Sequence, residues 1–270
     1  MPRRPTPRDV LLAECPYCIF CGGTEPATTI EHCPPRALFD RKQWPAGFDF
    51  ASCEACNAGS KNLDVVVAAL RRFDPTHSET DGDGRLMGLL RNARQQHPEF
   101  IEQMVSLSPV DARKAARRLG LARPPGMTFQ EIGIVRVTPE MDKAVYSLAA
   151  KLSRALYFKQ LGLIFPKDGV VLASWFSNAE KIESGQVRIL NTVAPLMAQV
   201  LEIQRSSKSL SDQFDCRVGF SDDNRLGVIS AVFGFVFGFV SFLDADNEKC
   251  MQNLRELEKA TGKPCPLTLC

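Results

Sequence analysis

The stretch LGVISAVFGFVFGFVSFL, residues 226–243, decides the fold class because it fits two structures. It is uncharged and long enough to cross a bilayer as a helix, and Gly234 and Gly238 have the GxxxG spacing of packed membrane helices. However, phenylalanine recurs at every second position from 233 to 239. This period places the rings on one face of a strand, whereas a helix would scatter them. We therefore expect strands with a bend at the glycines, with a membrane helix as the alternative.

The sequence around this stretch predicts an antiparallel sheet combined with helices. Extended segments are expected at 132–137, 170–176 and 214–220, and the last of these begins a meander that turns at 221–224. Helices are expected at about 109–120, 139–162 and 246–261, each ended or followed by a glycine. The apolar face of the helix at 139–162 is formed by Val145, Leu148, Leu152 and Leu156. The predicted fold class is α+β.

A polar, glycine-rich segment, HSETDGDG at 77–84, indicates a boundary between two domains. We expect a small N-terminal domain at 1–80 and a larger α+β domain with an antiparallel sheet at 85–270. The larger part contains no P-loop, no glycine-rich dinucleotide turn and no serine elbow. Its predicted role is to select substrate, to bind a protein partner or to hold a homo-oligomer together.

Composition limits the function classes. The chain has 270 residues, of which 44% are hydrophobic and 24% charged, a balance typical of globular proteins. Its net charge of +2 is too small to attract nucleic acid as a whole, so polyanion binding requires a local basic patch. The N-terminus lacks the apolar run of a secretory signal, which predicts a cytoplasmic protein without a membrane anchor. In that reducing compartment, the ten cysteines are not expected to form a disulfide framework, and the closely spaced pairs among them are expected to bind metal.

Two cysteine pairs have the spacing of a zinc site: Cys18 with Cys21 in CIFC, and Cys53 with Cys56 in CEAC. Two such turns complete a tetrahedral shell of four sulfurs around structural Zn²⁺. Cys15 and Cys18 in CPYC are an alternative first pair with the same spacing. We prefer Cys18 and Cys21, because the glycines at 22–23 allow the positive φ of such a turn.

The segment IEHCPP, residues 30–35, lies between the two pairs and contains one of only three histidines. His32 could be a zinc ligand, a general base or a packed core residue. Four cysteines complete the zinc shell without it, which leaves His32 available for chemistry. Cys33 has no partner at ligand spacing and is expected to be buried. A small basic cluster follows, suited to phosphate contacts, and consists of Arg36, Arg41 and Lys42.

The ordered elements CIFC, EHCPP and CEACN, with Lys61 shortly after, resemble the HNH endonucleases over about residues 15–69. The resemblance implies a zinc-bound ββα-metal core that hydrolyses phosphodiester bonds of DNA, or of RNA, in antiphage defence, restriction or a mobile element. His32 would be the general base. The implied ligands of a hydrolytic Mg²⁺ or Mn²⁺ are Glu31, Asn57 and Asp64, and the implied phosphate-binding residues are Arg36 and Lys61.

The chain also departs from the family pattern. The position of the middle asparagine is occupied by Phe48, beside which Asp49 could substitute, and the final histidine is missing. Asn57 could instead be a helix N-cap. These departures favour the alternative function, a non-catalytic zinc module that binds nucleic acid or protein.

Overall fold

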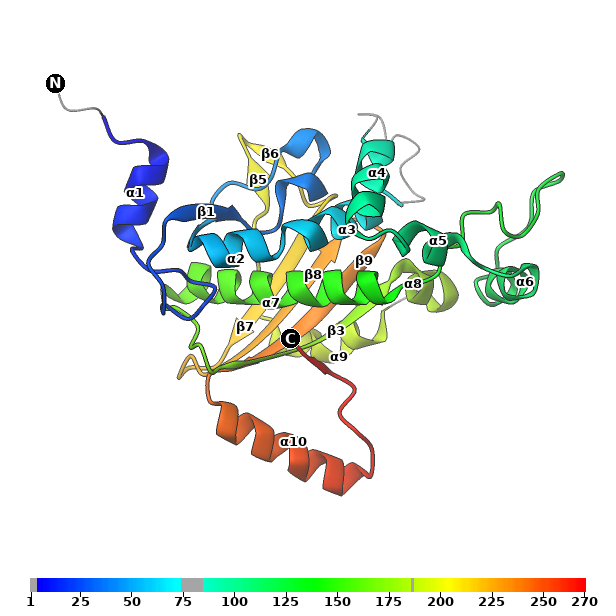
Figure 1. The fold of residues 1–270 in the computed structure, drawn as a ribbon. Coiled ribbons are helices and arrows are strands. Elements are labelled where there is room, and N and C mark those ends of the chain that lie inside the picture. Colours follow the sequence, from blue (N-terminus) through cyan, green and yellow to red (C-terminus); the bar gives the residue numbers. More distant parts are fainter. Residues whose placement is uncertain (1–3, 74–84, 186) are drawn as a thin grey trace.

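The computed structural model describes residues 4–73, 85–185 and 187–270, and one six-stranded antiparallel sheet lies at its centre (Figure 1). The strands follow the order β10-β3-β9-β8-β7-β4. Their bounds are β3 Val170–Ser177, β4 Gln199–Val200, β7 Asp215–Phe220, β8 Leu226–Phe233, β9 Phe237–Asp244 and β10 Thr268–Leu269. Two small antiparallel pairs accompany it: β1 Thr29–His32 with β2 Asp49–Ser52, and β5 Gln204–Arg205 with β6 Lys208–Ser209.

Helices surround the sheet. The α-helices are α1 Pro7–Glu14, α2 Glu54–Gly59, α3 Lys61–Arg71, α4 Leu86–Gln96, α5 Phe100–Val105, α6 Pro109–Arg118, α7 Pro139–Leu161, α8 Asn178–Ser184, α9 Arg188–Val193 and α10 Asn247–Thr261. The short 3₁₀ helices in the described residues are η1 Arg36–Leu38, η2 Asp40–Lys42 and η3 Ala194–Leu196. The fold is therefore α+β with an antiparallel sheet, as the sequence predicts.

Residues 226–243 form the hairpin β8–β9, which confirms the strand interpretation. The two strands are joined by a turn at 234–236. Phe233 pairs with Phe237 across the hairpin, and their rings stack 4.9 Å apart. Gly238 is required by close approach, because a Cβ there would lie 2.5 Å from the ring of Phe176 and 2.7 Å from the carbonyl of Ala231. Among the described helices, none combines the length and the apolarity needed to cross a membrane.

The other predicted elements are found with one exception. The meander, the strand at 170–177 and the helices α6, α7 and α10 lie where the sequence places them, with Gly162 and Gly262 in left-handed caps. The predicted strand at 132–137 is wrong. Gly133 has a φ of 79°, and the backbone amide of Arg136 donates to Met104 and not to a strand. This segment is rich in β-branched residues, but it pairs with no strand in the described part of the chain.

Helix α7 lies between the sheet and the unit formed by β1, β2, α2 and α3 (Figure 1). One hydrophobic cluster contains buried residues from all three layers, among them Ile19, Val66, Leu148, Leu152 and Phe239. The opposite face of the sheet packs on α9 and α10, because Val240 and Leu172 alternate with residues of the main cluster. The expected boundary at 77–84 lies outside the described residues, and the chain on both sides of it contributes to one core.

The close packing at Gly238 generates a stability prediction. Gly238→Ala is expected to lower the free energy of unfolding by roughly 1–3 kcal/mol, because the added methyl meets the Ala231 backbone, which cannot rotate away. Gly88→Ala in helix α4 is the control, since a Cβ there meets nothing within 4 Å and alanine favours a helix by up to about 1 kcal/mol. Urea unfolding of both variants measures the difference. Equal stabilities would contradict the packing described for β9.

Candidate functional site

Four cysteines converge where the N-terminal loop meets helix α2. The sulfur atoms of Cys18, Cys21, Cys53 and Cys56 all lie within 4.8 Å of one another. Gly22 and Gly23 follow the first pair with φ values of 72° and 77°, and the amide of Gly23 donates to the carbonyl of Cys18. Cys53 caps α2, since its sulfur accepts from the amide of Cys56 at 3.4 Å. Such a group of four thiol ligands suits tetrahedral Zn²⁺.

The remaining N-terminal cysteines lie outside this cluster. The thiol of Cys15 donates to the carbonyl of Tyr17 at 3.4 Å, so the structure brings together the preferred pair and not the CPYC alternative. Cys33 is 1% exposed, and burial raises the pKa of its thiol well above the usual value. It is a core residue, as expected.

A cleft of about 260 Å³ collects the other predicted site residues. Strand β1 contributes two of them, and η1, α2 and α3 contribute the rest: Glu31, His32, Arg36, Asn57, Lys61 and Asp64. Lys42 also lines it, whereas Arg41 does not. The side-chain amide of Asn57 donates through Nδ2 to the hydroxyl of Thr29 at 2.9 Å and to the carbonyl of Ile30 at 3.0 Å. These bonds connect α2 to β1. Cys53, and not Asn57, is the N-cap of α2, so the capping interpretation of Asn57 is wrong.

His32 is held by a carboxylate on the neighbouring strand. The β1–β2 register places Asp49 opposite His32, and Oδ1 of Asp49 lies 2.5 Å from Nδ1 of the imidazole. Trp44 donates its indole N–H to the same oxygen at 3.0 Å, and its ring lies 4.7 Å from the imidazole. Burial raises the pKa of Asp49, but the hydrogen bonds from His32 and Trp44 outweigh it and lower the pKa overall. Asp49 is therefore ionised and accepts a hydrogen bond from the N–H at Nδ1, so that in the neutral imidazole Nε2 carries the free lone pair.

The acidic side of the cleft has a partner that sequence reasoning missed. Lys151 of α7 donates to Oε1 of Glu31 at 2.8 Å and to the hydroxyl of Ser60 at 2.6 Å. That hydroxyl in turn donates to Asp64 at 3.3 Å, and burial raises the pKa of Asp64 to about 6. Lys151 is 120 residues from Glu31 in the chain, and no local spacing links them.

The donor chemistry of this side suits a divalent cation, but Glu31 is already ion-paired. Carboxylate and amide oxygens are the ligands that Mg²⁺ and Mn²⁺ prefer, and Glu31, Asn57 and Asp64 line one cleft. Over residues 4–73, 85–185 and 187–270, the four cysteines are the only group of at least three His, Cys, Asp or Glu ligand atoms within 4.8 Å. The ion ligands implied by the resemblance thus share a cleft in which one of them, Glu31, already has a cationic partner in Lys151.

A basic residue from the larger part of the chain packs on Trp44, the ring that contacts His32. The guanidinium of Arg205, at the end of β5, lies 4.0 Å from the ring centroid of Trp44 and donates to the Trp44 carbonyl at 2.9 Å. Arg36 lies 4.9 Å from the same ring. The hairpin β5–β6 therefore adds a cation to the basic cluster that the sequence predicts after EHCPP.

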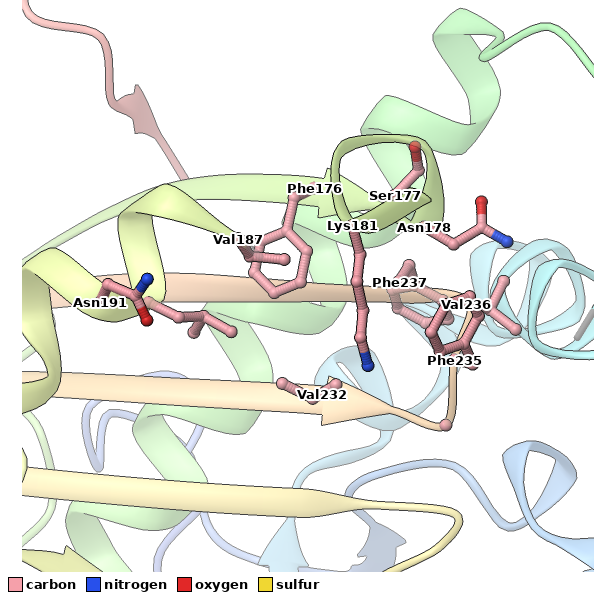
Figure 2. Close-up of a pocket in the computed structure, with 12 residues that line it drawn as sticks. Phe176, Ser177, Asn178, Lys181, Val187, Asn191, Val232, Phe235, Val236 and Phe237 are labelled. Carbon is pink, nitrogen blue, oxygen red and sulfur yellow. The ribbon is translucent and has the colours of Figure 1, made fainter. Parts of the chain in front are cut away.

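An apolar pocket of about 190 Å³ lies between β3, the β8–β9 turn and helices α8 and α9 (Figure 2). Its walls are mainly aliphatic and aromatic, and Lys181 points across it with its ammonium 4.3 Å from the ring of Phe235. No acid, histidine or cysteine lines it among the described residues. The candidate chemistry is concentrated in the cleft at β1 and α3.

Comparison of the chain with protein-family models, with curated proteins and with solved structures gave no match. The functional assignment therefore depends on the residues and geometry of the cleft.

The cysteine cluster generates the second prediction. One Zn²⁺ per chain is expected, and Cys53→Ser should lose it and unfold the N-terminal unit, because metal binding contributes folding free energy. Cys15→Ser is the control and should keep its zinc, since Cys15 lies outside the cluster. Elemental analysis combined with thermal unfolding measures both effects. Zinc loss in Cys15→Ser would show that the first pair is Cys15 and Cys18.

Proposed function

We propose that the chain is an endonuclease of the HNH type that hydrolyses DNA phosphodiester bonds, with His32 as general base. The observation that supports this most is the bond of 2.5 Å between His32 and Asp49, in a cleft that cations line and next to the four-cysteine cluster. Asp49 takes the orienting role that the family gives to its middle asparagine. By the same resemblance, defence against phage, restriction and mobile elements are the proposed settings.

The residues have separate tasks in the proposed reaction. Nε2 of His32 removes a proton from the attacking water, while Asp49 stabilises the imidazolium that forms. Arg36 and Lys61 line the cleft and hold the scissile phosphate and its neighbour by charge-assisted hydrogen bonds. A divalent ion held by Glu31, Asn57 and Asp64 would offset the negative charge that develops on the phosphate.

A non-catalytic zinc module that binds nucleic acid or protein is the second candidate. The ion pair between Glu31 and Lys151 favours it, because a carboxylate already neutralised attracts a divalent ion less. The two candidates share the zinc cluster and the basic cleft, so only a measurement of cleavage separates them. RNA is the alternative substrate, and parallel assays on duplex DNA and single-stranded RNA distinguish it from DNA.

The base assignment generates the third prediction. His32→Ala should reduce nicking of a supercoiled plasmid in the presence of Mg²⁺ or Mn²⁺ by about 10²- to 10⁴-fold, the usual contribution of a general base. Asp49→Ala should reduce it by roughly 10- to 100-fold, because the imidazole then loses the hydrogen-bond partner that orients it. EDTA should stop cleavage by the unmodified chain.

Both variants should keep their zinc and their melting temperature, since neither residue belongs to the cysteine cluster. Loss of zinc in His32→Ala would make the histidine a ligand and contradict its role as base. If the unmodified chain binds DNA but does not cut DNA or RNA with either metal, the non-catalytic module is the better description.

The position of Arg205 generates the fourth prediction. Arg205→Ala should weaken binding of the chain to duplex DNA and lower the slope of log K against log salt by about 0.9, the value of one phosphate contact. Arg255→Ala is the matched control, because Arg255 is exposed on α10 and bonds only to the Met251 carbonyl of its own helix among the described contacts. Fluorescence anisotropy at several salt concentrations measures both. Equal slopes would exclude the β5–β6 hairpin from the DNA-binding surface.

A further inference from the structure

The ammonium group of Lys151 has three hydrogen-bond acceptors, one of which is the cleft residue Glu31. It donates to Oε1 of Glu31 at 2.8 Å, to the hydroxyl of Ser60 at 2.6 Å and to the carbonyl of Cys56 at 3.5 Å. Its side chain is 15% exposed and that of Glu31 is 8% exposed. Three acceptors match the three N–H donors of a lysine, so the protein supplies a cation of its own at the carboxylate that the HNH resemblance assigns to a divalent ion.

Docking of α7 on the N-terminal unit does not by itself require such an ion pair. Lys159 lies on the same helix and also reaches the N-terminal unit, where it donates to the carbonyl of Gly47 at 2.9 Å and lies over the ring of Phe48. No carboxylate contacts Lys159 among the described salt bridges. The two lysines thus fasten the same helix to the same unit, and only Lys151 neutralises a residue of the candidate site.

We propose that Lys151 is a built-in cation that competes with a divalent ion for Glu31, so that helix α7 sets the metal affinity of the cleft. A like charge beside a metal ligand opposes the second cation through Coulomb repulsion, most strongly where water is largely excluded. Occupation of the cleft by Mg²⁺ or Mn²⁺ then requires Glu31 to exchange its ammonium partner for the ion. The inference relies on the ion site of the proposed function but not on the cleavage reaction.

Titration of the full-length chain with Mn²⁺, followed by the electron paramagnetic resonance signal of the free ion, tests the proposal without nucleic acid. Zinc content is measured first in every variant. Lys151→Met, which removes the charge and keeps most of the volume, should bind one Mn²⁺ at least tenfold more tightly than the unmodified chain. Lys159→Met, the matched control, should bind it with unchanged affinity. Glu31→Gln in the Lys151→Met background should abolish the gain.

Weaker or unchanged Mn²⁺ binding in Lys151→Met would overturn the proposal, since Lys151 would then orient Glu31 as a ligand or only fasten α7. Lys151→Arg keeps the charge and should retain the affinity of the unmodified chain; tight binding in this variant would also overturn it. Lys151→Gln provides a neutral polar substitute if methionine prevents folding, and the same gain is expected. A gain in Mn²⁺ affinity without nuclease activity would contradict the proposed function alone, whereas metal-dependent cleavage without the gain would contradict this inference alone.

Discussion

Helix α7 is the constraint on which both halves of the chain depend, because it is buried against two layers. Its 23 residues carry a broad stripe of buried side chains, including Val145, Leu148, Leu152 and Leu156. One side packs on β3 and β9 and the other on α3. Each fully buried aliphatic side chain contributes about 1.5–3 kcal/mol. The position of α7 therefore determines the geometry of the cleft, and the unit that contains the four cysteines depends on the sheet for its packing.

Local patterns in the sequence predict the elements in which short-range chemistry decides the structure. The two CxxC spacings predict the two pairs of the cysteine cluster, and the period of two at 226–243 predicts the β8–β9 hairpin, since each pair and the hairpin turn depend on neighbours a few residues apart. The segment at 132–137 is rich in β-branched residues but forms no strand, because a strand also requires a neighbouring strand with which to pair. A sequence pattern indicates which side chains lie on the same face of a strand. It does not indicate whether another strand is available to pair with it.

Local sequence patterns also predict part of the candidate site, namely the cleft residues that are close together in the chain. Its residues between Glu31 and Asp64 come from one local unit, and the motif order already groups them. Lys151 and Arg205 are added from segments more than 80 residues further along the chain, as the separations of 120 residues for Glu31–Lys151 and 161 for Trp44–Arg205 show. Lysine on an amphipathic helix and arginine in a hairpin are ordinary surface residues in sequence. Their roles follow only from the tertiary packing of α7 and of β5–β6 on the N-terminal unit.

In and beside the cleft, each acid accepts a hydrogen bond from another side chain of the protein, whereas several cations are exposed. Asp49 accepts from His32 and Trp44, Glu31 from Lys151, and Asp64 from the Ser60 hydroxyl. Arg36 and Lys42 are exposed and line the same cleft without a carboxylate partner among the described salt bridges. An anionic ligand therefore meets unpaired positive charge at the mouth, whereas a cation must displace an existing partner to reach Glu31. If the proposed function holds, this asymmetry favours a phosphate backbone as the first ligand of the cleft, because phosphate needs no rearrangement of the acids. A bound phosphate would also add the negative charge that makes a divalent ion more competitive with Lys151, so that substrate and ion would enter together.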